Sequence, residues 1–194
     1  PRSPLFPYTT LFRSIVTEDR DFADYTIYRP ADLEAAACEK KLPLVVFGNG
    51  GCMNRSTYFE KMLSEIASFG YVVVAVGSYY ENEEEASADP KASEWTDYHL
   101  LTRAIDLMEK ATDNPQSVFY QRVDLGKVAV MGQSCGGLQA LAVSPDVRVR
   151  TTVVLNSGVI AAEGTELSAN GQNLVVDKSV LRQLHAPILY LVGG

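Results

Sequence analysis

The pattern of apolar and polar residues divides the chain into short strands and longer amphipathic helices. Short β-prone, largely apolar runs predict strands at 25–28, 44–47, 71–76, 128–131, 151–155 and 188–192. Apolar residues at helical spacing predict helices over 58–69, 95–111, 138–143 and 177–184, and 31–41 is a loop or a short helix. Strands that alternate with helices predict an α/β fold, a mostly parallel sheet with helices on both faces, in a single domain.

Composition and charge narrow the choice of partners. The 194 residues carry a formal net charge of −7, which argues against binding nucleic acid phosphates or an anionic membrane surface. No apolar run approaches the roughly 20 residues of a membrane-spanning helix. The cysteines, Cys38, Cys52 and Cys135, fit no zinc or redox spacing. No metal and no organic cofactor is expected. The oligomeric state is left open.

Both ends of the chain differ from the rest. Residues 1–14 contain three prolines, two arginines and no acid, and Phe6-Pro-Tyr-Thr-Thr-Leu-Phe-Arg-Ser14 reads like a translated sequencing adapter. The alternative is a disordered natural N-terminus. At the other end, a buried-strand pattern runs directly into Gly193-Gly194. We therefore expect one α/β domain over 15–194 that is incomplete at its C-terminus.

The sharpest motif is Gly132-Gln133-Ser134-Cys135-Gly136, which fits G-x-S-x-G. A predicted strand leads into it and a predicted helix leads out. A serine on so tight a turn needs glycine two positions before and after it, where side chains would collide. Ser134 is therefore the predicted nucleophile, on what is called a nucleophile elbow. A tightly packed or phosphate-binding glycine turn is the alternative, but the dinucleotide and P-loop motifs are not matched.

Cys135, the residue after Ser134, is the alternative nucleophile. A cysteine elbow needs glycine two positions away on each side, and Gln133 occupies one of them. The backbone N–H of Cys135 is instead a predicted donor to the oxyanion, the negatively charged oxygen that forms during acyl transfer.

A second glycine-rich loop, Gly48-Asn-Gly-Gly-Cys-Met53, follows the predicted strand 44–47. Glycines let a backbone turn its N–H groups towards an oxygen. The loop lies at the chain position where this architecture supplies its second oxyanion donor, so Gly51 or Cys52 is the predicted donor. The alternative is a loop whose glycines only relieve crowding.

If the N–H groups of Cys52 and Cys135 serve one oxyanion, the two residues lie close together. A Cys52–Cys135 disulfide could then brace the oxyanion site and would indicate an oxidising compartment. Two buried free thiols are the alternative.

These motifs resemble the α/β-hydrolase superfamily over about 21–194. The resemblance is carried by Gly48-Asn-Gly-Gly-Cys52, by Ile-Ala-Ser-Phe-Gly-Tyr-Val-Val-Val-Ala75 and by Gly-Gln-Ser-Cys-Gly-Gly137. Within the superfamily the chain is most similar to dienelactone hydrolases, cutinases and polyester hydrolases, through Asp24-Tyr-Thr-Ile-Tyr-Arg-Pro30. The resemblance implies a Ser–acid–His triad in that chain order, with the acid and the histidine falling after Gly194.

The two histidines present are not predicted to be catalytic. His99 falls within the predicted helix 95–111, and His185 precedes the last strand, at the end of the sheet opposite the elbow. The acids Asp124, Asp146 and Asp177 occupy loop or helix-cap positions and are not nominated. Without a base, Ser134 is a poor nucleophile, so we expect residues 1–194 alone to be nearly inactive.

Residues 77–93 are acidic and have no clear period. They are either a mouth that repels anionic substrates or a solvated surface loop. Tyr79, Tyr80 and Trp95 could line an acyl or aromatic pocket, and 156–176 is a candidate lid.

The sequence thus predicts hydrolysis of a small-molecule or polymeric carboxylic ester through an acyl-enzyme at Ser134. Acyl transfer, thioester cleavage or peptide cleavage on the same scaffold, and a non-catalytic ligand-binding relative, are the alternatives. Without the natural start of the chain, the compartment is open, with a secreted or periplasmic protein favoured.

Overall fold

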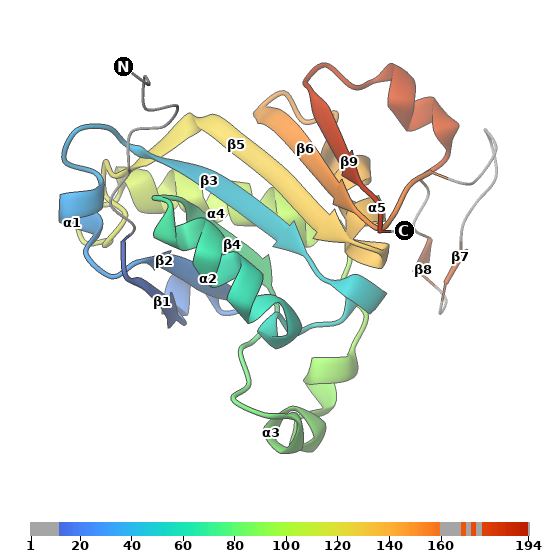
Figure 1. The fold of residues 1–194 in the computed structure, drawn as a ribbon, viewed down its shortest axis with the longest axis horizontal. Helices are drawn as coiled ribbons and strands as arrows, with labels where there is room; N and C mark the ends of the chain where they lie inside the picture. Colours follow the sequence, from blue (N-terminus) through green and yellow to red (C-terminus); the bar gives the residue numbers. More distant parts are fainter. Residues whose placement is uncertain (1–11, 160–167, 170–171, 174–175, 194) are drawn as a thin grey trace, which may run out of the picture.

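The computed structural model describes residues 12–159, 168–169, 172–173 and 176–193 (Figure 1). Among them, seven strands form one sheet. Across the sheet they are β1 (Ser14–Thr17), β2 (Tyr25–Pro30), β4 (Val72–Val76), β3 (Leu42–Gly48), β5 (Val123–Gln133), β6 (Val149–Leu155) and β9 (Ile188–Leu191). The strands from β4 to β9 run parallel, and β1 and β2 are antiparallel to their neighbours. The predicted mostly parallel sheet is confirmed.

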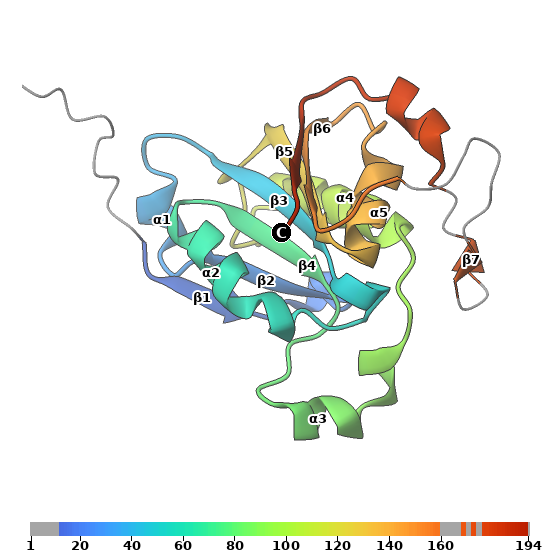
Figure 2. The same ribbon diagram turned by 45° about the vertical axis from the view of Figure 1, so that its right-hand side comes forward.

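Helices cover both faces of this sheet (Figures 1 and 2). The α-helices are α1 (Leu33–Ala36), α2 (Glu60–Ser68), α3 (Glu83–Ala88), α4 (His99–Asp113) and α5 (Cys135–Val143). The 3₁₀ turns are η1 (Arg20–Phe22), η2 (Gly50–Cys52), η3 (Thr57–Phe59), η4 (Pro90–Ser93) and η5 (Lys178–Arg182). A two-stranded hairpin, β7 (Ser168–Ala169) and β8 (Gln172–Asn173), lies apart from the main sheet. No helix in the described ranges has the length and apolar character to cross a membrane.

The alternation of side chains along β3 divides the core into two layers. Leu44 and Val46 pack with the helix α4, whereas Val45 and Phe47 pack with α2 on the opposite face. Both sets are almost completely buried. A strand buried on both faces needs apolar residues at every position, which is why β3 reads as a continuous apolar run.

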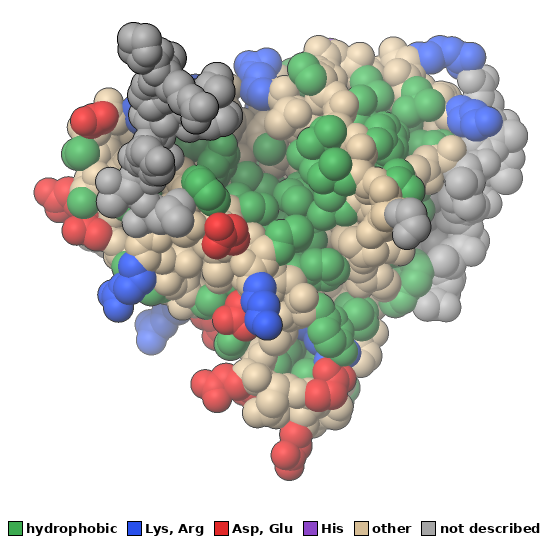
Figure 3. Space-filling model, viewed as in Figure 1, with side chains coloured by type: hydrophobic (Ala, Val, Ile, Leu, Met, Phe, Trp, Pro, Cys, Tyr) green, Lys and Arg blue, Asp and Glu red, His purple; other side chains and the backbone are tan. Residues whose placement is uncertain are grey.

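The part of the sheet next to β9 is less covered. Val153 and Leu155 of β6 lie beside Leu189 and Leu191 of β9, and the two β9 side chains are about half exposed. In the view of Figure 3, apolar side chains gather at the surface over this part of the sheet.

Two elements differ from the sequence prediction in type. The acidic segment 77–93 is not irregular, because it contains the helix α3 and the 3₁₀ turn η4. Asn82 starts α3 by accepting a hydrogen bond from the Glu85 N–H at 2.9 Å. The predicted helix 177–184 is instead the 3₁₀ turn η5.

The strand β1 was not predicted. It begins at Ser14, which pairs with Pro30, and the Phe12 N–H donates to the Ser68 carbonyl at 2.8 Å. Phe12 also packs against the core. The fold thus takes in the last residues of the segment 1–14, while the origin of that segment stays a prediction.

Candidate active site

The candidate site lies where parallel strands end side by side. Gly48, the last residue of β3, pairs with Gly132 of β5, and Gln133 pairs with Leu155 of β6. The carboxyl ends of neighbouring parallel strands are where α/β folds place ligands. The two glycine-rich loops of the sequence therefore leave the sheet next to each other.

Ser134 occupies the sharp turn between β5 and α5. Its backbone angles are φ 51° and ψ −117°, a region that residues other than glycine seldom adopt. Its N–H donates to the Leu155 carbonyl at 2.9 Å, and the residue is exposed. Cys135 starts α5 directly afterwards, so its N–H belongs to the first turn, where no intrahelical acceptor exists. The geometry is that expected of a nucleophile elbow.

The elbow glycines are required by neighbouring backbone. A Cβ on Gly132 would lie 2.0 Å from the Gly136 carbonyl oxygen. A Cβ on Gly136 would lie 2.1 Å from the Gly48 carbonyl oxygen, so it would meet the end of β3. Backbone atoms cannot move aside as a flexible side chain can. The predicted collision within the turn agrees with the packing at Gly132, whereas Gly136 is required by the end of a different strand, β3.

The loop after β3 forms the turn η2. Gly51 (φ 64°) and Cys52 (φ 50°) both adopt the left-handed region. The Cys52 N–H donates to the Asn49 carbonyl at 3.1 Å, which closes the turn and occupies that N–H. The Gly51 N–H precedes this first hydrogen bond of the turn, and Gly51 is exposed while Cys52 is buried. Of the two predicted donors, Gly51 is thus the better placed.

A disulfide joins this turn to the elbow. Cys52 and Cys135 are bonded, with their Cα atoms 5.2 Å apart and 83 positions apart in sequence. The hypothesis that these two residues lie together as a disulfide is confirmed, and the alternative of two free thiols is not. Cys38 is free and exposed.

Three polar side chains that the sequence pattern does not predict also hold the turn. Asn49 donates through Nδ2 to the Met53 and Val76 carbonyls, at 3.0 and 2.6 Å. Thr96 binds the Cys52 carbonyl, and Gln139 of α5 binds Thr96. Asn49 stands within the glycine run, but no local signal identifies Thr96 or Gln139.

The histidines lie as follows. His99 is the first residue of α4 rather than a side chain packed on the sheet. Its side chain is 72% exposed and its Nδ1 lies 2.6 Å from Asp97 Oδ1. His185 lies near the start of β6, where its Nε2 is 3.0 Å from the Val149 carbonyl oxygen. That is the end of the sheet opposite the elbow, as predicted.

Asp124, Asp146 and Asp177, for which no catalytic role is predicted, have other partners. Asp124 pairs with Lys127, and Asp146 pairs with Arg148. Their pKa values are lowered mainly by those hydrogen bonds. Asp177 caps η5 by accepting from the Ser179 N–H at 2.7 Å. Asp146 and Asp177 lie in a loop and at a cap, as predicted, whereas Asp124 lies in the strand β5, opposite Pro43 of β3.

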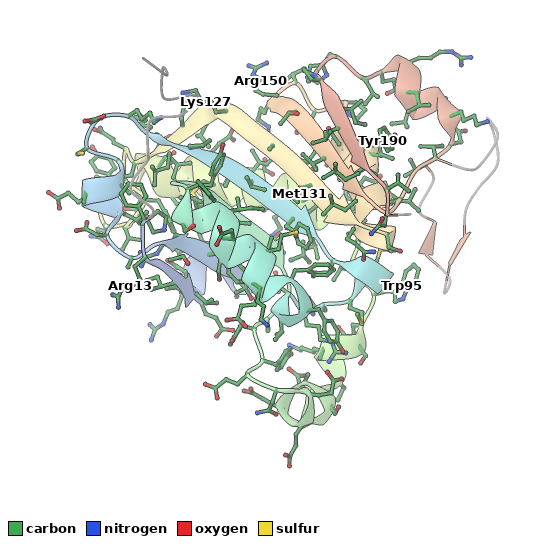
Figure 4. The ribbon with its side chains drawn as sticks, viewed as in Figure 1. Arg13, Trp95, Lys127, Met131, Arg150 and Tyr190 are labelled. Atoms are coloured by element: carbon green, nitrogen blue, oxygen red, sulfur yellow. A yellow bond between two sulfur atoms is a disulfide. The ribbon has the colours of Figure 1, made fainter. Side chains whose placement is uncertain are left out.

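The aromatic residues that were predicted to line a pocket lie in different surroundings. Trp95 forms a β-bridge with Met53 and lies at the end of the sheet beside η2 (Figure 4). Tyr80 is instead buried with Ala86 and Ala92, and its hydroxyl donates to Asp89 at 2.8 Å. Most of the candidate lid 156–176 lies outside the described residues. In the ranges that are described, no group of three His, Cys, Asp or Glu side chains could hold a metal ion.

Comparison with known proteins gives the family. A family model described as Chlorophyllase matches residues 24–166, which include both the turn η2 and the elbow. A search of curated proteins found no match. The match covers most of the chain and agrees with the α/β-hydrolase resemblance. The chain therefore belongs to the chlorophyllase family, a family of α/β-hydrolase-type serine esterases.

Proposed function

We propose that the protein hydrolyses a carboxylic ester through an acyl-enzyme formed on Ser134. The observation that carries this proposal is the exposed Ser134 in a strained turn, beside a second turn to which it is tied by the Cys52–Cys135 disulfide. Backbone strain of this kind persists where a function requires it and the surrounding structure enforces it. Membership of a serine esterase family supports the same reaction.

The proposed reaction has two halves. Ser134 Oγ attacks the ester carbonyl carbon while a base takes the hydroxyl proton, and the tetrahedral intermediate then expels the alcohol. Water attacks the resulting acyl-enzyme in the second half and releases the acid. The N–H groups of Cys135 and Gly51 are proposed to stabilise the negative oxygen in both intermediates, since neither is used within its own turn.

The base is proposed to be a histidine that follows Gly194 in the chain, oriented by an acid between the two. Neither described histidine suits this role, because His99 is turned to solvent beside Asp97 and His185 lies at the opposite end of the sheet. The Ser–acid–His order of α/β-hydrolases supports this placement.

The first test is the DNA sequence beyond Gly194. An Asp or Glu within a few residues, and a His some tens of residues later, would complete the proposed triad. Absence of either would overturn the proposed relay and favour a ligand-binding protein.

The second test is ester hydrolysis by the chain extended to its natural stop codon. With p-nitrophenyl esters of short and long acyl chains, Ser134→Ala should lower kcat by about 10⁴-fold or more. Ser93→Ala, an exposed serine at the end of η4, is the control and should leave kcat unchanged. Equal activity in the wild type and Ser134→Ala would overturn the proposal. Competition by alcohols, thiols or amines would separate hydrolysis from acyl transfer.

A further inference from the structure

The turn η2 adopts a conformation that it would not keep alone. Cys52 has a φ of 50°, a left-handed conformation that is unfavourable for a residue with a Cβ. Such a residue stays in place only where surrounding contacts enforce it. Gly51 is joined directly to Cys52, so a displacement of the Cys52 backbone would also displace the Gly51 backbone and its N–H. The contacts that hold Cys52 therefore also help to hold the proposed oxyanion donor.

Thr96 supplies two of those contacts. Its N–H and its hydroxyl both donate to the Cys52 carbonyl oxygen, at 2.8 and 2.9 Å. Cys52 is 1% exposed and Thr96 is 6% exposed, so water does not compete for these hydrogen bonds. Thr96 lies between η4 and α4, outside both glycine-rich loops.

Gln139 ties Thr96 to the helix that begins after the nucleophile. Its Nε2 donates to the Thr96 carbonyl at 2.6 Å and to the Thr96 hydroxyl at 3.3 Å. It is 1% exposed and lies against the end of β3, because a Cβ on Gly48 would be 3.0 Å from its Oε1. One buried chain of hydrogen bonds thus runs from α5 through Thr96 to the Cys52 carbonyl.

This series of hydrogen bonds is separate from the disulfide. The disulfide fixes the side chain of Cys52 relative to Cys135, but it leaves the peptide planes on either side of Cys52 free to rotate. Thr96 holds the Cys52 carbonyl, which belongs to the peptide after Cys52. Asn49 holds the next carbonyl, that of Met53. The backbone orientation of the turn therefore depends on hydrogen bonds that the disulfide cannot replace.

We propose that Thr96 and Gln139 are positioning residues that hold the turn η2 in the orientation in which the Gly51 N–H faces the oxyanion. This inference rests on the proposed esterase function and adds to it two residues that do not touch the substrate. Their loss should act on the step in which negative charge develops, so it should lower kcat and leave KM unchanged.

The test compares two buried threonines in the extended chain. Thr96→Val removes the hydroxyl and keeps the shape, and we expect kcat to fall about tenfold with KM within about twofold. Thr96→Ser restores the hydroxyl and should recover most of the loss. The matched control is Thr152→Val, which removes another buried hydroxyl, the partner of Ser144 at 2.8 Å, and should leave kcat unchanged. Gln139→Met should lower kcat as Thr96→Val does.

Hydrogen exchange of the backbone N–H groups in 49–56 provides a readout without catalysis. Exchange there should be faster in Thr96→Val and Gln139→Met than in the wild type and Thr152→Val. An unchanged kcat, a change confined to KM, an equal loss in Thr152→Val, or no recovery in Thr96→Ser would overturn the inference. If the wild type shows no hydrolysis beyond that of Ser134→Ala, the proposed function fails, and unchanged exchange in 49–56 would then show that Thr96 and Gln139 do not hold the turn.

Discussion

Single residues at the elbow are held in place by backbone rather than by side chains. Ser134 adopts its unusual φ because β5 ends and α5 starts without any intervening loop. Gly136 makes this possible, since its missing Cβ leaves room for the carbonyl oxygen of Gly48. The residue therefore couples the elbow to β3, the strand that leads to the second turn of the site.

Gly136→Ala should destabilise the protein strongly. The new Cβ would lie 2.1 Å from the Gly48 carbonyl oxygen, and overpacking against atoms that cannot move aside costs about 1–3 kcal/mol or more. Urea unfolding followed by circular dichroism measures the change. Gly158→Ala is the control, because its Cβ would meet only Tyr190 Cε1 at 3.8 Å. Equal midpoints for the two variants would show that the elbow can relax.

At the scale of elements, the disulfide joins two turns that follow different strands. Cys52 belongs to η2 after β3, and Cys135 starts α5 after β5. The closed loop spans 83 positions, so the crosslink restricts a large part of the unfolded chain. It also keeps η2 and the start of α5 together, which is the arrangement that the proposed oxyanion site needs.

Removal of the disulfide should lower stability by about 2–4 kcal/mol. The variant is Cys52→Ser with Cys135→Ser, and the measurement is the free energy of unfolding in urea. Cys38→Ser, which removes the exposed free thiol, should change the value by less than about 0.5 kcal/mol. If the double variant and a reduced wild type are as stable as the oxidised wild type, the crosslink has no stabilising role.

A second link between elements is the ion cluster around Arg148. This arginine, in the turn before β6, contacts Asp106 and Glu109 of α4 at 2.6 and 3.1 Å. It also pairs with Asp146 at 2.7 Å. The side chain is 25% exposed, so the cluster is only partly screened by water. It fixes the middle of α4 against the start of β6.

Arg148→Ala should therefore destabilise the fold by about 1 kcal/mol, the upper range for partly exposed ion pairs. The loss should shrink at high salt, because screening weakens the pairs in the wild type. Arg150→Ala, an exposed arginine on β6, should have no comparable effect. Thermal unfolding of all three proteins at low and high salt decides between these outcomes.

At the scale of the whole molecule, carboxylates that accept hydrogen bonds in the folded state make the stability sensitive to low pH. The pKa of Asp146 is lowered by hydrogen bonds from Arg148, and the pKa of Asp124 is lowered chiefly by Lys127. The pKa of Asp89 is lowered by the Lys91 N–H and then by the Tyr80 hydroxyl. Each of these carboxylates binds protons less readily in the folded state than in the unfolded state.

The melting temperature should therefore fall as the pH drops below about 4. The stabilisation is fully present above the unfolded pKa, about 3.9 for aspartate, and is lost as the pH falls through the lower folded value. Thermal unfolding between pH 7 and pH 3 measures this loss. Asp146→Asn removes one of the responsible groups and should show a smaller decline. A melting temperature that stays constant or rises towards pH 3 would contradict the assignment.

Sequence patterns predicted most of the framework, because strands and helices follow from local periodicity. The runs at 44–47 and 128–131 are the middle parts of the longer strands β3 and β5. The elbow around Ser134 was also predictable from its motif, since Gly132 relieves a contact with the nearby Gly136, although the contact that Gly136 itself relieves lies at the distant Gly48. The helix α3 was missed, because its length is short and the signal is an Asn82 cap within an acidic run rather than an apolar period.

Local patterns in the sequence were enough to establish the α/β class, the position of the predicted nucleophile and the glycine-rich loop after the predicted strand 44–47. The bond between Cys52 and Cys135, and the contacts by which Thr96 and Gln139 hold the same turn, follow only from the arrangement of the strands in space. The physical reason is separation along the chain. Local spacing records collisions between near neighbours, whereas these contacts join residues that only the order of strands in the sheet brings together.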